Sequence, residues 1–259
     1  MLAQFGDILN WAAAGVFFPM LMLPLASLAR TKRSSAVLWL ALVAGVVASS
    51  TLFAILAVDL RPPKWSPGLA ITMASGAAIG AFLSLRAGAS ALSARLCAPI
   101  ETLVRGAGRL SLYLIIAMAL LQFAIVIMRY VFGLSFIAMQ ESVTYMHGAV
   151  FLLAGGYALL TDDHVRVDIF YREARPRTKA LVDLAGTYLL LFPFCLVALW
   201  AAGPYVANSW AVREGSMEQS GIRGVYLLKS LIPLYLVLLA LAGFSRATRA
   251  AEALKSRSD

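Results

Sequence analysis

The chain has 259 residues, of which 61% are hydrophobic and only 14% are charged, and its mean hydropathy is +0.82. A water-soluble protein of this size cannot bury that much apolar surface, so the composition excludes an ordinary soluble domain and indicates an integral membrane protein. The net charge of +9 would suit nucleic-acid binding. The basic residues instead lie in short segments between apolar runs, so we expect no nucleic-acid partner and a lipid bilayer around the chain.

The first 90 residues contain three apolar runs, at about residues 8–29, 36–58 and 66–86. Each is close to the length of about 20 apolar residues that a membrane-spanning helix needs. Residues 1–90 are therefore predicted to form an N-terminal module of three membrane helices. The first residues lack a basic segment, so we expect no cleavable signal peptide.

Residues 91–108 differ from the runs on either side because charged and polar residues interrupt them. Their apolar residues recur at helical spacing: Leu92, Leu96, Ile100, Leu103 and Val104. This pattern predicts an amphipathic helix that lies in the inner membrane interface and links the two parts of the chain. Pro99 is expected to break this helix in two. An ordinary cytoplasmic linker is the alternative.

Residues 109–259 are predicted to form a core of four membrane helices, at about residues 109–129, 140–161, 180–204 and 225–246. Pro193 should weaken or kink the third of these helices, and Pro204 is expected to mark its end. The whole chain is thus predicted to be an all-α polytopic membrane protein with about seven spans. Seven spans also fit the charges, because 16 of the 22 Lys and Arg residues then fall in inner segments. The positive-inside rule places the N-terminus in the periplasm and the C-terminus in the cytoplasm.

The most polar short stretch is residues 162–168, which read Asp-Asp-His-Val-Arg-Val-Asp directly after an apolar span. A divalent metal site is one interpretation, but the stretch lacks EF-hand spacing and contains Arg166. The negative end of a helix dipole disfavours acidic residues, so Asp162 and Asp163 should have partners. We expect these to be basic residues of the following segment, Arg172, Arg175 or Arg177, or another subunit. A simple solvated loop remains the alternative.

Other chemistry is poorly supported. His147 lies within a predicted span and is expected to form a hydrogen bond inside the bundle, although haem binding with His164 is an alternative. No Asp or Glu lies deep in a span, and no nucleophile, zinc or phosphate-binding motif occurs. The two cysteines, Cys97 and Cys195, are far apart and have no metal-site spacing. We therefore expect no enzyme activity, no metal, no cofactor and no transport by this chain alone.

Three stretches of the last 150 or so residues carry a family resemblance. The first is residues 129–133, Arg-Tyr-Val-Phe-Gly. The second runs from Glu141 through Gly155-Gly156 to the most specific piece, residues 164–168, His-Val-Arg-Val-Asp. The third is Ser220-Gly221 followed by the span that contains Pro233. Together they resemble the small membrane subunit of tripartite ATP-independent periplasmic (TRAP) transporters, to which residues 1–90 would add three helices.

The resemblance implies a role in a bacterial inner membrane transporter. A periplasmic binding protein would deliver an organic acid, and a large membrane subunit would import it with sodium. The small subunit would be a fixed scaffold for the large one. The matching residues would serve as interface or structural residues: Arg129, Glu141, His164, Arg166 and Asp168.

Two alternatives to the transporter role stay open. One is a membrane anchor or assembly subunit of an unrelated complex, and the other is a haem-carrying membrane subunit of a respiratory enzyme. The chain also departs from the family, which often has a Trp and two acidic residues where this chain has residues 136–141.

Overall fold

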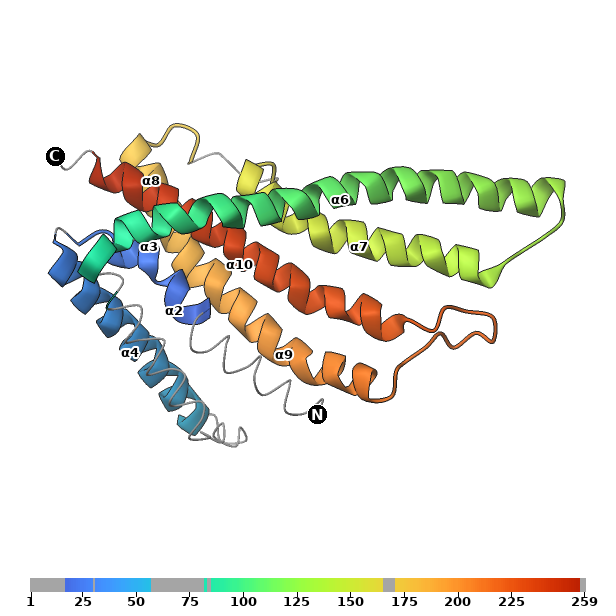
Figure 1. Ribbon diagram of the computed structural model, residues 1–259, viewed down its shortest axis with the longest axis horizontal. Helices are drawn as coiled ribbons and strands as arrows, with labels where there is room; N and C mark the ends of the chain where they lie inside the picture. The colour runs from blue at the N-terminus through green and yellow to red at the C-terminus, as the bar shows by residue number, and fades with distance from the viewer. Residues whose placement is uncertain (1–16, 30, 57–81, 83–84, 165–170, 257–259) are drawn as a thin grey trace. The chain divides into compact units, whose positions relative to one another are not determined.

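The structure is a computed structural model that describes residues 17–29, 31–56, 82, 85–164 and 171–256. Figure 1 shows that the regular elements of this part of the chain are helices. In chain order they are α2 (Phe18–Leu21), α3 (Leu23–Ala26), α4 (Lys32–Leu56), α6 (Ala89–Val131), α7 (Ile137–Thr161), α8 (Pro176–Gly186), the π-helix η2 (Thr187–Leu191), α9 (Phe192–Ala211) and α10 (Val225–Lys255).

Four helical segments within the described residues are long and apolar enough to cross a membrane. They are α6, α7, the continuous stretch Pro176–Ala211, and α10. Each coincides with one of the four predicted core spans, so the prediction of an all-α membrane protein is confirmed. The predicted span at residues 36–58 falls largely on α4. Of the span predicted at residues 8–29, residues 17–29 are described, and they form the two short helices α2 and α3 instead of one continuous helix. Most of the span predicted at residues 66–86 lies outside the described residues.

Helix α6 differs from expectation because it runs without interruption through Pro99 for 43 residues. It joins the predicted interfacial helix at residues 91–108 to the predicted span at residues 109–129. The expected break at Pro99 is therefore wrong. A proline removes one backbone hydrogen bond and crowds the preceding turn. When strong helix-forming segments continue on both sides, the helix bends at the proline instead of ending there.

The third membrane helix is irregular just before Pro193, as predicted. A proline has no N–H group, so one hydrogen bond of the regular pattern is lost at that position. Here Thr187–Leu191 form a single π-helical turn, in which the Phe192 N–H donates to the Thr187 carbonyl. Pro204 was expected to end this helix, and that prediction is wrong because α9 continues to Ala211.

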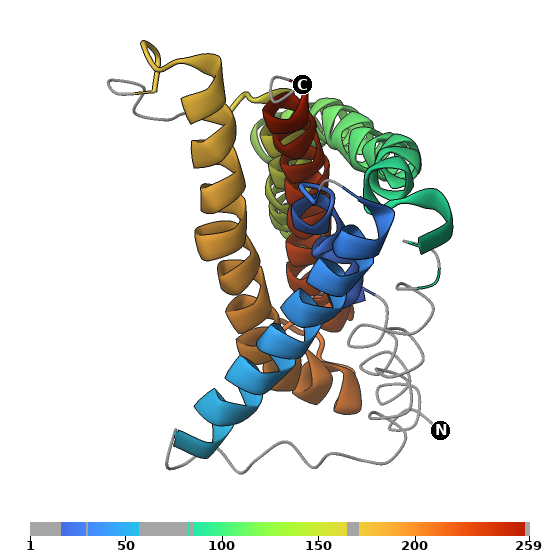
Figure 2. The ribbon, with the colours of Figure 1, turned by 90° about the vertical axis from the view of Figure 1, so that its left-hand side faces the viewer.

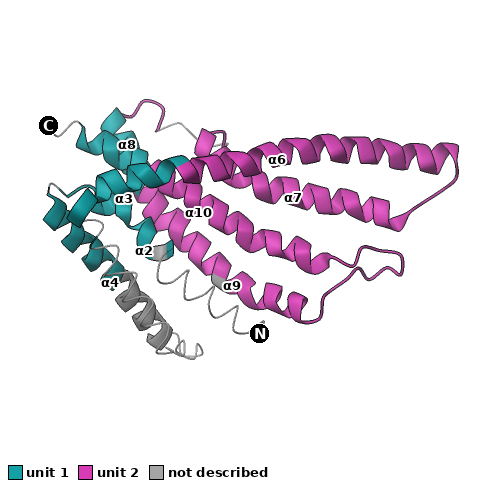
Figure 3. Ribbon diagram, viewed as in Figure 1, with its two compact units in different colours: residues 1–98, 175–184, 247–259 teal, residues 99–174, 185–246 magenta. Residues whose placement is uncertain are grey.

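The chain divides into two compact units, shown in Figure 3. Unit 1 comprises Met1–Ala98, Arg175–Leu184 and Ala247–Asp259. In its described part, Trp39 of α4 is 2% exposed and its indole Nε1–H donates to the Pro19 carbonyl at 2.9 Å. The Ser35 hydroxyl of α4 donates to the Ala26 carbonyl at 2.9 Å, so two side-chain bonds join α4 to the short helices before it. The division into residues 1–90, 91–108 and 109–259 stays a prediction.

Unit 2 comprises Pro99–Ala174 and Ala185–Arg246. Within it α10 lies between α9 and α7, and α6 lies on the other side of α7 (Figure 1, Figure 2). Helices α7 and α10 approach closely because Gly156 has no side chain. A Cβ atom at Gly156 would lie 3.0 Å from both the carbonyl carbon and the carbonyl oxygen of Leu238. Small residues allow this kind of close backbone approach between membrane helices.

Candidate functional site

Glu141 lies one turn into α7 and bonds to the loop of residues 212–224, which connects α9 to α10. Its Oε2 atom accepts a hydrogen bond from the Ile222 backbone N–H at 2.6 Å. Its Oε1 atom accepts a hydrogen bond from the Ser216 hydroxyl. The same hydroxyl oxygen accepts the Glu218 backbone N–H at 3.1 Å. One carboxylate therefore fixes two points of a loop that is 75 to 81 residues away in the sequence.

Gly221 is required by this arrangement. A Cβ atom at position 221 would lie 2.8 Å from Glu141 Oε1 and would also collide with the Ser216 side chain. Sequence reasoning singled out Glu141 and Ser220-Gly221 but did not predict that they meet. It missed Ser216 and Ile222, because a serine in a loop and a backbone N–H group carry no sequence signal of their own.

An ion pair fixes the start of α10 near the same loop. Lys229 Nζ lies 2.5 Å from Glu214 Oε2 and 4.1 Å from the centroid of the Tyr205 ring. The Lys229 side chain is only 14% exposed. The hydrogen bond from Lys229 lowers the pKa of the Glu214 carboxyl below its ordinary value. Trp210 adds a neutral contact, donating from Nε1–H to the Ser230 hydroxyl oxygen at 2.7 Å.

Arg129 does not join these contacts. It lies near the C-terminal end of α6 with an exposed side chain, and it has no hydrogen-bond or ion-pair partner among the described residues. Arg129 and Glu141 therefore do not pair in the described part of the chain.

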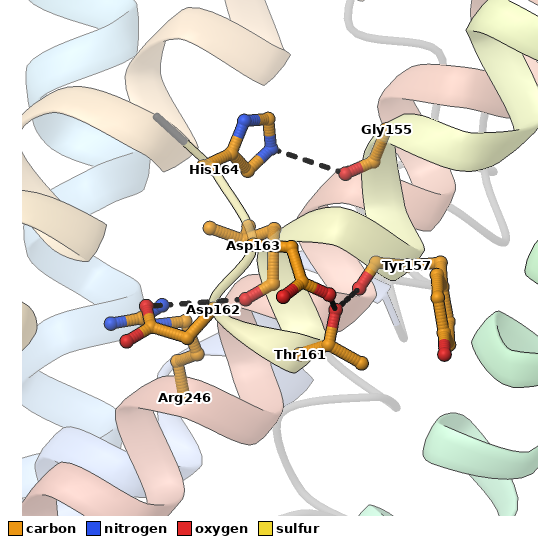
Figure 4. Close-up of polar contacts among 8 residues, drawn as sticks. Gly155, Tyr157, Thr161, Asp162, Asp163, His164 and Arg246 are labelled. Atoms are coloured by element: carbon orange, nitrogen blue, oxygen red, sulfur yellow. Dashed lines mark hydrogen bonds and ion pairs between the residues drawn. The ribbon is translucent and has the colours of Figure 1, made fainter. Parts of the chain in front are cut away.

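The opposite end of α7 carries the polar stretch that begins at Asp162, shown in Figure 4. Asp162 caps α7 in the left-handed conformation, with φ of 65°. Its Oδ1 lies 2.5 Å from Nη1 of Arg246 on α10, and Arg246 also donates to the Leu159 carbonyl at 3.3 Å. A guanidinium at the negative end of a helix stabilises both the carboxylate and the last free carbonyls. Sequence reasoning expected a partner for Asp162 but did not identify Arg246, which is 84 residues away.

Asp163 and His164 fold back against the last turns of α7 (Figure 4). The Asp163 backbone N–H donates to the Ala158 carbonyl at 2.9 Å. The Thr161 hydroxyl lies 2.9 Å from the Tyr157 carbonyl oxygen and also contacts the Asp163 carboxylate. His164 Nε2 lies 3.3 Å from the Gly155 carbonyl oxygen. Arg166 and Asp168, the other predicted site residues of this stretch, lie outside the described residues.

The predicted site residues therefore do not form one site. Glu141 and His164 lie at opposite ends of α7, which is about 30 Å long between them at a rise of about 1.5 Å per residue. Two separate polar clusters result. The Glu141 cluster fixes the loop between α9 and α10, and the Asp162 cluster joins α7 to α10. Hydrogen bonds hold the Glu141 cluster together, and an ion pair with hydrogen bonds holds the Asp162 cluster together.

His147 contradicts its expected role within the bundle. Its side chain is exposed and has no hydrogen-bond partner among the described residues. It lines an open cavity of about 460 Å³ between α6 and α7. The other histidine, His164, contacts the Gly155 carbonyl, which lies eight residues, or about 12 Å, further along the same helix. Two histidines so placed do not flank one haem, which needs its axial ligands on opposite faces.

Comparison with known proteins gives one match. Residues 118–253 match the family model described as "Tripartite ATP-independent periplasmic transporters, DctQ component". No curated protein and no solved structure matches the chain. The matched region begins within α6, ends within α10 and includes both polar clusters of α7. It covers more than half of the chain, and its helices are those of a multi-pass inner membrane protein. The chain therefore belongs to the DctQ family, the small membrane subunits of tripartite ATP-independent periplasmic transporters.

Proposed function

We propose that this subunit is a rigid support for the large membrane subunit of its transporter, and that the large subunit carries an organic acid across the membrane together with sodium. This role is supported by where the charged residues lie. The charged residues of the four-helix core lie outside the apolar runs of its spans, and Glu141, Asp162 and Glu214 are each bonded within the subunit.

Ion-coupled carriers need groups that bind ions or substrate inside the membrane. Such groups are ionisable side chains within spans, or helices broken near the midplane. In this chain residues 110–128, 142–161, 184–212 and 230–245 contain no Asp, Glu, Lys or Arg. This distribution supports a proposal in which the large subunit holds the substrate and sodium sites and the periplasmic binding protein delivers the organic acid to it.

The charge distribution supports an orientation with the N-terminus in the periplasm and the C-terminus in the cytoplasm. In this orientation the Glu141 cluster lies at the periplasmic end of α7, and the Asp162 cluster lies at the cytoplasmic end. Among the family-matching residues, Glu141 and His164 would hold the shape of the subunit. Arg129, Arg166 and Asp168 would be available to the interface with the large subunit.

Co-purification tests the support role. Tagged wild-type protein from native membranes should bring down the large subunit whether or not sodium and substrate are present. Glu141→Gln should reduce the amount of large subunit recovered, because an amide cannot accept hydrogen bonds at both oxygen positions. Glu218→Gln is the matched control, since Glu218 lies in the same loop with an exposed side chain. Recovery of no large subunit with the wild type would overturn the proposal and favour an anchor for an unrelated complex.

A further inference from the structure

Three polar side chains line the open cavity between α6 and α7 that contains His147. They are Gln122 of α6 and Thr144 and His147 of α7, all exposed, and the rest of the lining is Met118, Ala119 and Val143. The cavity lies within unit 2. None of the three polar side chains has a hydrogen-bond partner among the described residues.

The depth of these side chains makes their lack of partners costly. Gln122 lies nine residues before the end of α6 at Val131, and Thr144 and His147 lie seven and ten residues after the start of α7 at Ile137. At about 1.5 Å per residue, all three lie about 10 to 15 Å from the helix ends that face the connecting segment 132–136. The hydrocarbon core of a bilayer is about 30 Å thick, so the cavity opens near its middle.

Lipid cannot satisfy these groups. Acyl chains offer no hydrogen bonds, and headgroups remain at the membrane surface. Each unsatisfied polar group in hydrocarbon carries a free-energy cost, and polar side chains in membrane helices usually face other helices. The neutral side chains of Gln, Thr and His each offer both a donor and an acceptor. Ala119 in the lining also allows a second helix to approach closely.

We infer that this cavity is a docking groove for a transmembrane helix of the large subunit that presents Ser, Thr, Asn or Gln to Gln122, Thr144 and His147. The inference rests on the proposed support role and places part of the subunit interface on the α6–α7 face. The groove selects a polar helix over lipid because only such a helix supplies the missing hydrogen bonds.

A photo-reactive amino acid placed at Gln122 in the assembled transporter, in native membranes, tests the location. The expected product is a covalent adduct of the small and large subunits, several-fold more abundant than from the same amino acid at Val197, which is an exposed position on α9. An adduct with a second copy of this chain, a crosslink within the chain, or reaction with lipid only would overturn the inference. Equal adducts from Gln122 and Val197 would also overturn it.

The chemistry of the groove is tested by substitutions that keep its shape. Gln122→Leu and Thr144→Val should each weaken retention of the large subunit by about 3- to 20-fold, the range measured for single hydrogen bonds between membrane helices. Thr144→Ser keeps the hydroxyl and should bind like the wild type. If the wild type and these variants retain the large subunit equally well, the inferred docking groove is wrong and the support role stands. If the wild type retains none, both proposals fail.

Discussion

The substitution Gly156→Ala tests the packing that holds the two polar clusters in place. Gly156 lies where α7 meets the backbone of α10, and an added Cβ would lie 3.0 Å from the carbonyl carbon and oxygen of Leu238 and 3.1 Å from its Cβ. Ordinary contacts between nonbonded carbon atoms are about 3.5 to 4.0 Å. A backbone carbonyl cannot rotate away as a side chain can, so the two helices must separate by several tenths of an ångström.

The expected cost is that of inserting one methyl group into a closely packed core, about 1–3 kcal/mol of unfolding free energy. The matched control is Gly203→Ala in α9. No described atom outside the local helix lies within 4 Å of a Cβ at that position. Since Ala is about 1 kcal/mol more favourable than Gly within a helix, Gly203→Ala should leave the stability unchanged or raise it.

The measurement is reversible unfolding of the purified subunit or complex in mixed micelles, followed by a helix-sensitive signal. Gly156→Ala should unfold at lower denaturant than the wild type, and Gly203→Ala should not. Equal stability of the two variants would refute the close contact between α7 and α10. It would also remove the reason why Glu141 and Asp162 face their partners.

Three further predictions concern charged residues. The pKa of Glu214 is lowered in the folded protein, so its ion pair stabilises the fold above the ordinary carboxyl pKa of about 4.3 and this contribution is lost as pH falls through the lower, folded value. The unfolding free energy should be measured from pH 7 to pH 3. The wild type should be more stable than Glu214→Gln at neutral pH and equally stable at the acid end. A stability difference that does not change with pH would contradict the ion pair. Asp162→Asn and Arg246→Gln should each lower the unfolding free energy. A double-mutant cycle should give a coupling energy of at most about 1 kcal/mol, because the ion pair is partly exposed. A coupling energy of zero would contradict the ion pair. Reversal of the charges of Arg166 and Asp168 should reduce complex assembly more than substrate affinity, and intact assembly with altered selectivity would overturn their interface role.

The helical architecture was predictable because it depends on local composition. Long uncharged runs located the four core helices, and the start of α10 and the end of α7 fall where the sequence placed them. The effects of prolines were not predictable one by one. Pro193 follows a π-helical turn, whereas α6 and α9 continue through Pro99 and Pro204. Whether a helix bends or ends at a proline depends on how well the flanking segments are stabilised.

The candidate site was predictable only in part, because its contacts are distant in the sequence. Glu141 was singled out by family resemblance, but its partner at Ile222 is a backbone N–H, which any residue other than proline supplies. The need of Asp162 for a cation followed from its place at a helix end, whereas the choice of Arg246 depends on the packing of α7 against α10. The role of His147 was predicted wrongly because periodicity does not distinguish a helix face buried in its own bundle from a face exposed on the subunit.

Substrate uptake by proteoliposomes that contain the purified transporter is the most direct test of the support role. The large subunit would be reconstituted with wild-type small subunit or with Glu141→Gln, and uptake of substrate would be measured at several concentrations and divided by the amount of assembled complex. We predict that Glu141→Gln lowers the amount of complex while leaving its substrate affinity and sodium dependence unchanged. Full assembly with a changed substrate affinity would contradict the account, because it would place this subunit in the transport site.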